Sequence, residues 1–274
     1  MVFLLVLVAA RTAQAIEPFQ VVSSIAPVNL LVTALAGPEV QARTLLNASA
    51  DPHEVSLRLS DRKLLDKADL VIWLGPNLER FLIKALPESR TLEIGELPGL
   101  VWPAGREGKD MHLWLNPANA KIIARAIAAH LSARLPTSAP LIQQRLDALI
   151  VRIDDVSARI KTRLAPVHTV PFGVGHDGYG HWVNYLGLNQ VAALSVLPEQ
   201  HLGAKHLMDV QQKLVGARCV VTDFSEGNQQ KLHELLQLPV FVADPLAQSR
   251  SYADYGEFLL ALADVFSSCL GQPG

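Results

Sequence analysis

The stretch "PLIQQRLDALIVRIDDVSARIKTRLAP" (residues 140–166) decides the architecture that we expect for this chain. Its apolar residues recur every three or four positions, and no glycine or proline lies between the two flanking prolines. These apolar residues are Leu141, Leu146, Leu149, Ile150, Ile153, Val156, Ile160 and Leu164. A stripe with this period predicts one long amphipathic helix that buries one face.

Strand and helix signals alternate on both sides of this helix. Before it, we expect strands at 19–24, 39–46 and 68–75, and helices at 27–36, from Ser60, at 77–86 and from Asn116 to Leu135. After it, we expect strands at 167–174, 189–194, 218–222 and 239–243, and helices at 178–186, 203–215, 226–237 and 251–269. Such alternation is typical of parallel sheets.

We therefore predict an α/β protein with two Rossmann-like lobes, each built on a parallel sheet and joined by one long rigid helix. The expected boundaries are 16–136 for the N-terminal lobe, 137–166 for the linker helix and 167–274 for the C-terminal lobe. A ligand site is expected in the cleft between the lobes, because open α/β sheets bind ligands beyond the carboxyl ends of their strands.

The first fifteen residues predict a signal peptide and export of the chain. "VFLLVLVAA" is apolar but too short to span a bilayer, and "AQA" (13–15) resembles a cleavage site. The alternative is a buried N-terminal strand or helix. No other stretch has the length of a membrane helix, so we expect a protein that does not span the membrane.

The net charge of the chain argues against one class of partner, and its two cysteines favour a disulfide. The 274 residues carry a net charge of −2 without a basic run, which argues against a nucleic-acid partner. We expect a monomer. An exported chain with two cysteines, Cys219 and Cys269, favours a disulfide over two buried thiols.

Four candidate metal ligands lie in loops that one cleft could collect: His53, His112, His176 and Asp244. Three neutral imidazoles and a carboxylate suit tetrahedral Zn²⁺, at roughly 2.0–2.2 Å, better than Mn²⁺, which prefers more oxygen. Because a histidine binds metal only when deprotonated, affinity should fall as the pH drops through about 6.5.

The residues by themselves leave other readings open, because no compact motif such as H-E-x-x-H is present. Asp244 could instead cap a helix or act at a hinge, with water completing the tetrahedron. Alternative fourth ligands are Asp51, Glu54 and Asp223. A zinc hydrolase is a second functional class, in which Asp177 or Glu54 would serve as the base for a metal-activated water.

The motifs of the chain resemble those of the zinc-binding, periplasmic substrate-binding proteins of ABC importers, the helix-linked metal receptors. The resemblance rests on "DPHEVSLRLSDRKLLDKADLVIWLGPNLERFL", "MHLWLNP", "HDGYGHW" and "DPLAQSRSYADYGEFL". In that family, two α/β lobes joined by a rigid helix hold one metal ion. The receptor delivers the ion to a membrane permease with an ATPase subunit.

The resemblance implies a ligand set residue by residue: His53, His112, His176 and Asp244 match the four ligand positions. It also implies a Cys219–Cys269 disulfide. Relatives that bind manganese or iron usually carry a glutamate at the third ligand position, so His176 favours zinc as the transported ion. A receptor for Mn²⁺, Fe²⁺ or a metal chelate is the alternative.

Four departures from the family pattern keep that alternative open. The segment "PAGREGKD" (103–110) replaces a long His-rich loop, and Leu59 replaces a usual proline. Asp223 stands where a glutamate is usual. His181 stands where an aromatic residue is typical; we expect it beside the ligands or at the rim of the site rather than among the ligands.

Overall fold

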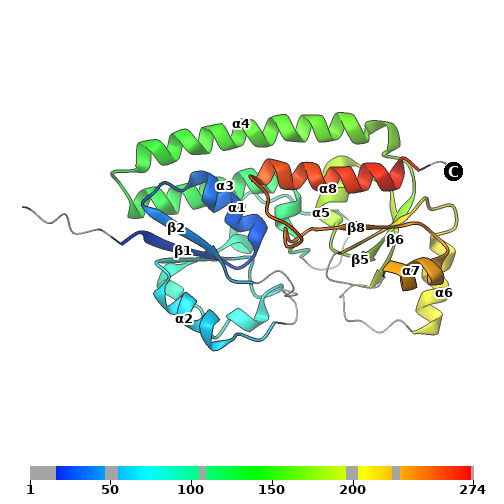
Figure 1. Ribbon diagram of the computed structural model, residues 1–274, viewed down its shortest axis with the longest axis horizontal. Helices are drawn as coiled ribbons and strands as arrows, with labels where there is room; N and C mark the ends of the chain where they lie inside the picture. Colours follow the sequence, from blue (N-terminus) through cyan, green and yellow to red (C-terminus); the bar gives the residue numbers. More distant parts are fainter. Residues whose placement is uncertain (1–16, 47–54, 105–108, 196–202, 224–228, 273–274) are drawn as a thin grey trace, which may run out of the picture.

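The computed structural model describes residues 17–46, 55–104, 109–195, 203–223 and 229–272, which form two α/β lobes bridged along one side by a long helix (Figure 1). The N-terminal lobe is built from β1 (Phe19–Ser23), α1 (Ala26–Leu35), β2 (Val40–Thr44), α2 (Leu59–Lys67), β3 (Leu70–Trp73), β4 (Thr91–Glu93) and α3 (Pro117–Arg134). Its strands are all parallel, in the order β2-β1-β3-β4.

The C-terminal lobe repeats this design after the long helix. It comprises β5 (Phe172–His176), α5 (Gly180–Leu186), β6 (Gln190–Ser195), α6 (Ala204–Lys213), β7 (Val220–Asp223), α7 (Gln229–Leu236), β8 (Val240–Ala243) and α8 (Tyr255–Leu270). Its strands are parallel, in the order β6-β5-β7-β8. The predicted fold class, two parallel-sheet lobes with one connecting helix, is confirmed.

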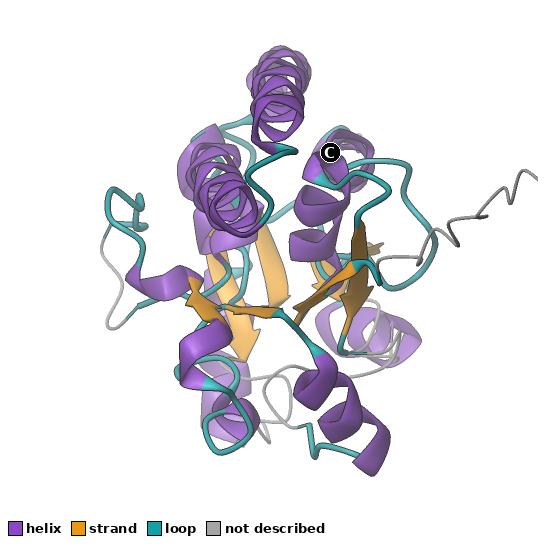
Figure 2. Ribbon diagram, turned by 90° about the vertical axis from the view of Figure 1, so that its left-hand side faces the viewer, coloured by secondary structure: helices purple, strands orange, loops and turns teal. Residues whose placement is uncertain are grey.

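The strands β3, β5 and β7 are buried throughout, and because successive strand residues point to opposite sides, both faces of each sheet are covered there. In β3, Leu70 and Ile72 join the main core, whereas Val71 and Trp73 join a smaller cluster with Leu65 of α2. Figure 2 shows helices above and below the strands. The main core includes residues of both lobes, so the lobes share apolar packing.

The connecting helix α4 (Ala139–Leu164) runs along both lobes and packs against α1, α3 and α8, which all lie below it in Figure 1. Its buried stripe contains Ile142, Leu146, Leu149, Ile153, Val156, Ile160 and Leu164. Leu141 was expected in this stripe but is 53% exposed, because it lies one residue outside the three- and four-residue spacing that begins at Ile142.

Two sequence predictions were wrong. Residues 77–86 are not an α-helix: tight turns surround a short 3-10 helix, η1 (Arg80–Leu82). The buried Glu79 carboxylate accepts a hydrogen bond from the Leu74 amide at 2.7 Å, which folds this segment back on the end of β3. The strand predicted at 167–174 begins at Phe172, after a 3-10 turn and a bend.

Replacing Glu79 by glutamine should remove a pH-dependent destabilisation. Burial raises the pKa of Glu79 to about 7, although the Leu74 hydrogen bond favours the ionised form. The unfolded chain ionises this group near 4.5. The free energy of unfolding should therefore fall by roughly 3 kcal/mol between about pH 4.5 and pH 7 on account of this group.

Urea denaturation of the wild type and Glu79→Gln at about pH 5 and pH 8 measures this effect. Glutamine can still accept the Leu74 hydrogen bond, so the difference in stability between the two proteins should change with pH by that amount. An identical pH dependence in both proteins would rule out a buried carboxyl that resists ionisation.

The predicted disulfide is present in the structure. Cys219 and Cys269 form a disulfide between the start of β7 and the end of α8, with 5.6 Å between their Cα atoms. Every helix in the described part of the chain is too short or too polar to span a bilayer. The signal peptide expected at 1–15 lies outside the described residues, and the domain boundaries stay a prediction.

Candidate metal centre

The carboxyl ends of three neighbouring strands supply polar side chains on the C-terminal lobe. His176 is the last residue of β5, Asp223 is the last residue of β7, and Asp244 directly follows β8. Because these strands are adjacent and parallel in the order β5-β7-β8, their ends lie along the same edge of the sheet.

The N-terminal lobe contributes His112 from the turn that leads into α3. His112 precedes the 3-10 helix η4 (Leu113–Leu115), and the Asn116 side chain then caps α3 by accepting from the Ala118 amide at 2.8 Å. Pro117 occupies the first turn of α3, where its missing N–H leaves no intrahelical bond unmade. This local sequence therefore places His112 just ahead of a well-defined helix start.

Hydrogen bonds between the lobes hold this turn against the C-terminal lobe. The Trp114 indole donates to the Pro245 carbonyl at 2.7 Å, and the Tyr255 hydroxyl donates to the Trp114 carbonyl at 2.5 Å. His181 is fully buried, and its Nε2 lies 2.7 Å from the Asp110 carbonyl. The segment that carries His112 is thus fastened to the other lobe.

His112 and His176 meet across the interface between the lobes. Their ring centroids are 5.0 Å apart, and His176 is 4% exposed. Gly178 lies against both rings: a Cβ atom there would be 2.8 Å from Nδ1 of His176 and 2.9 Å from Nε2 of His112. The two imidazoles can approach this closely because residue 178 has no side chain.

Each of these two imidazoles has a carboxylate beside its Nδ1 atom. Asp110 Oδ1 lies 2.8 Å from Nδ1 of His112 and also accepts the His112 amide at 3.1 Å. Asp223 Oδ2 lies 3.4 Å from Nδ1 of His176. Although burial opposes ionisation of Asp110, hydrogen bonding and charge from His112 and His181 lower its pKa below the usual value.

Asp244 is engaged within its own loop. Its carboxylate accepts the amides of Gln248 (2.7 Å) and Ser249 (2.8 Å), together with the hydroxyls of Ser249 (2.6 Å) and Tyr252 (3.0 Å). These contacts match the hinge or capping role that was the alternative for this residue. A metal-ligand role for Asp244 stays a prediction.

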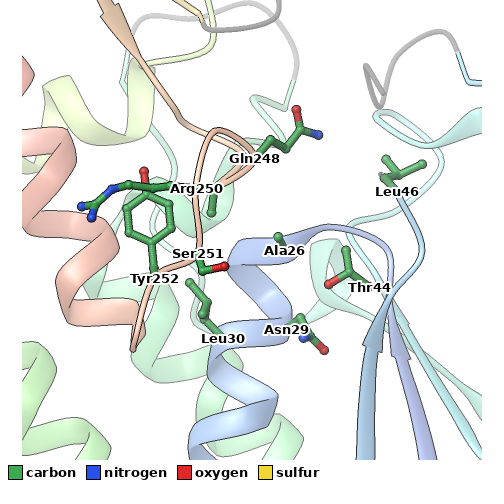
Figure 3. A pocket seen from close by; sticks show the side chains of 10 residues that line it. Ala26, Asn29, Leu30, Thr44, Leu46, Gln248, Arg250, Ser251 and Tyr252 are labelled. Atoms are coloured by element: carbon green, nitrogen blue, oxygen red, sulfur yellow. The ribbon is translucent and has the colours of Figure 1, made fainter. Parts of the chain in front are cut away.

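The segment between β8 and α8 (residues 244–254) is called the Asp244 loop here. A cavity of about 450 Å³ lies where this loop meets the N-terminal lobe (Figure 3). It is lined by Ala26, Asn29, Leu30, Thr44, Leu46, Ala247, Gln248, Arg250, Ser251 and Tyr252. Arg250 forms an ion pair with Glu257 at 3.1 Å, and Figure 3 shows its guanidinium turned away from Thr44. The cavity separates the Asp244 loop from β2, the strand that leads toward His53.

The remaining predicted residues fall in three groups. His53, Asp51 and Glu54 lie outside the described residues. Asp177 accepts a hydrogen bond from Gln190 at 2.9 Å. His181 lies beside the ligand candidates, since its ring contacts the Asp110 carbonyl and, at 3.4 Å, the Asn119 side chain. Within the described part of the chain, no group of three or more His, Cys, Asp or Glu side chains is arranged to hold a metal ion.

Sequence reasoning missed Asp110 and Gly178. The D-x-H spacing of Asp110 and His112 was a local signal that could have revealed the first residue. Gly178 has no such signal, because its importance depends on a ring from the opposite lobe. Asp223 was considered as an alternative ligand, but not as the partner of His176.

Comparisons with known proteins agree with this architecture. The family model described as "Zinc-uptake complex component A periplasmic" (ZnuA) matches residues 21–269. The high-affinity zinc uptake system protein ZnuA of Yersinia pestis is 30% identical over 292 residues, covering 91% of each chain. The protein of the same name from Haemophilus ducreyi is 29% identical, covering 92% of this chain and 93% of its own.

Solved structures share the fold at lower sequence identity. A crystal structure of ZnuA superposes with a TM-score of 0.81 at 18% identity, covering 93% of this chain and 100% of that one. The periplasmic zinc-binding protein TroA of Treponema pallidum superposes with a TM-score of 0.80, also at 18% identity, covering 93% and 99%. The family match spans both lobes and the helix between them, and the chain therefore belongs to the periplasmic component A family of zinc-uptake complexes.

Proposed function

We propose that this protein binds one Zn²⁺ ion between its lobes through His53, His112 and His176, with Asp244 or water as the fourth ligand. Family membership assigns the chain to zinc capture for an ABC importer, and the family consists of solute-binding proteins rather than enzymes. The ion is thus cargo passed to a permease and its ATPase. A zinc hydrolase is no longer a competing class.

The observation that carries this proposal is the meeting of His112 and His176 from opposite lobes. The buried imidazole of His176 and the partly buried imidazole of His112 have ring centroids 5.0 Å apart, and each has its Nδ1 beside a carboxylate. The two rings are therefore suited to present Nε2 atoms to one ion. His53 follows β2 in the N-terminal lobe and would supply the third imidazole. Three nitrogens and one oxygen form a set that zinc accepts.

The contacts between the lobes favour a small closure over a wide hinge motion. α4 packs on both lobes, and the hydrogen bonds between Trp114 and Pro245 and between Tyr255 and Trp114 would have to break in a wide opening. We therefore expect the ion to be released when the permease displaces the segment that carries His53, rather than by separation of the lobes.

Two further properties belong to this proposal. The family is periplasmic, and we propose that residues 1–15 are the signal peptide that directs export. We also propose that the mature protein is a monomer. Analytical ultracentrifugation of the exported protein would show a dimer if this second point is wrong.

Native mass spectrometry tests the metal site. The metal-stripped mature protein, offered equimolar Zn²⁺, Mn²⁺ and Fe²⁺, should retain one zinc ion. His176→Ala should retain no zinc, because the C-terminal lobe loses the only imidazole that we propose it contributes to the site. His130→Ala is the matched control, since His130 is exposed on α3 and should not affect retention. Retained zinc in His176→Ala, or a preference for manganese or iron, would contradict the proposal.

A further inference from the structure

We propose that Asp110 and Asp223 are positioning residues that select Nε2 of His112 and His176 as the metal-binding atoms, one carboxylate acting in each lobe. This inference rests on the proposed zinc site. Neither aspartate is expected to touch the ion. Each would act through the imidazole beside it, by receiving its Nδ1 proton.

The chemistry of the two partners decides which ring nitrogen carries the proton. An ionised carboxylate can only accept a hydrogen bond, so the imidazole nitrogen that faces it must be the donor. A neutral imidazole that donates through Nδ1 has its lone pair on Nε2. The Asp110 and Asp223 contacts therefore both favour the form of histidine that binds metal through Nε2.

Asp110 holds His112 in two places. The same Oδ1 atom lies 2.8 Å from Nδ1 of the ring and accepts the backbone amide of His112 at 3.1 Å. The His181 ring contacts the Asp110 carbonyl at 2.7 Å, so the C-terminal lobe in turn steadies the aspartate. The orientation of the His112 ring thus depends on contacts from both lobes.

Asp223 holds His176 with the help of a tyrosine. The Tyr179 hydroxyl donates to Asp223 Oδ1, and Oδ2 of the same carboxylate lies 3.4 Å from Nδ1 of His176. The side chains of His176 and Asp223 are 5% and 11% exposed, so water competes little for these contacts. Tyr179 therefore orients the carboxylate so that its second oxygen faces the ring.

Zinc affinity, measured by competition with a chromophoric chelator at about pH 8, tests this arrangement. Asp223→Ala should weaken binding by about 10- to 100-fold, the usual effect of losing an outer partner of a metal-bound histidine. Asp223→Asn keeps an oxygen that can accept the Nδ1 proton and should retain most of the affinity. Tyr179→Phe, which leaves the carboxylate in place, should give a smaller loss.

Long-range ¹H–¹⁵N spectra distinguish positioning from a general loss of structure. In the metal-free wild type, His176 should carry its proton on Nδ1, and in the zinc-loaded protein Nε2 should be the metal-bound atom. Asp223→Ala should shift the metal-free ring toward the form protonated on Nε2. Asp264→Ala is the control, because Asp264 pairs with Arg163 on the outer surface.

The same variants at Asp110 give an independent readout in the other lobe. Because Asp110→Ala would strand the His112 amide, Asp110→Asn is the better-tolerated variant, and its ring spectrum should retain the Nδ1 proton on His112. Unchanged zinc affinity and unchanged ring spectra in Asp223→Ala would overturn this inference and leave the zinc site standing. A wild type that binds no zinc would overturn both.

Discussion

Gly178→Ala should abolish tight zinc binding while leaving the protein folded. The added Cβ would lie 2.7 Å from Cε1 of His176 and 2.9 Å from Nε2 of His112, closer than carbon normally approaches such atoms. Either ring could turn away only by leaving its carboxylate, Asp223 or Asp110. Because one methyl group would displace both proposed ligands, we expect a loss above the roughly 100-fold typical of a lost outer contact.

The backbone gives no reason for Gly178→Ala to unfold the protein. Gly178 is absent from the described residues with positive φ, so alanine can adopt its conformation without strain. Gly203→Ala is the matched control, since no atom of the described residues lies within 4 Å of its Cβ position and its φ is −67°. Calorimetric titration with zinc and thermal unfolding of both metal-free variants would measure the two effects separately.

If Gly178→Ala binds zinc as tightly as the wild type does, the two rings cannot both be ligands in the arrangement seen here. If it loses both zinc and its unfolding transition, the glycine is needed for folding rather than for the site. The predicted result is a normal unfolding transition without zinc-induced stabilisation, which should be present in Gly203→Ala.

Removing the Cys219–Cys269 disulfide should destabilise the protein by roughly 4 kcal/mol, the loop-closure entropy of a loop of this length. The two cysteines are 50 residues apart and fully buried, joining β7 to α8. The crosslink thus encloses β7 and β8, which end at Asp223 and just before Asp244. Urea denaturation of the double variant Cys219→Ala/Cys269→Ala measures the loss.

The single variants are the controls for this prediction. Each single substitution removes the crosslink. If the entropy of the unfolded chain is responsible, Cys219→Ala and Cys269→Ala should therefore each lose about as much stability as the double variant. Additive losses would instead assign the effect to local packing around the two sulfur atoms. Below the unfolding transition, zinc affinity should be unchanged, because neither cysteine contacts His112, His176 or the two aspartates in the described structure.

Much of the fold could be predicted because it depends on local periodicity. The 3.6-residue stripe of 140–166 and the strand–helix alternation depend on residues close together in sequence, and both are present in the structure. The segment 77–86 shows where that reasoning fails. Its pattern is helical, but burial of Glu79 against the Leu74 amide outweighs helix propensity.

The candidate site divides in the same way. His176 and Asp244 could be located from the sequence because they lie at the carboxyl ends of strands, and His112 because it precedes a capped helix. The residues that hydrogen-bond to these side chains could not all be identified from the sequence. Asp223 lies 47 residues from His176, and His181 lies 71 residues from the Asp110 carbonyl that it contacts.

The sequence by itself determined the two parallel-sheet lobes, the long helix between them and the strand ends where ligands should lie, because periodicity and turn signals act over a few residues. Only the tertiary structure decided that His112 and His176 meet, that Asp223 lies beside Nδ1 of His176, and that residue 178 lies against both rings. These features depend on short distances between residues from different lobes or different strands, which no local pattern specifies.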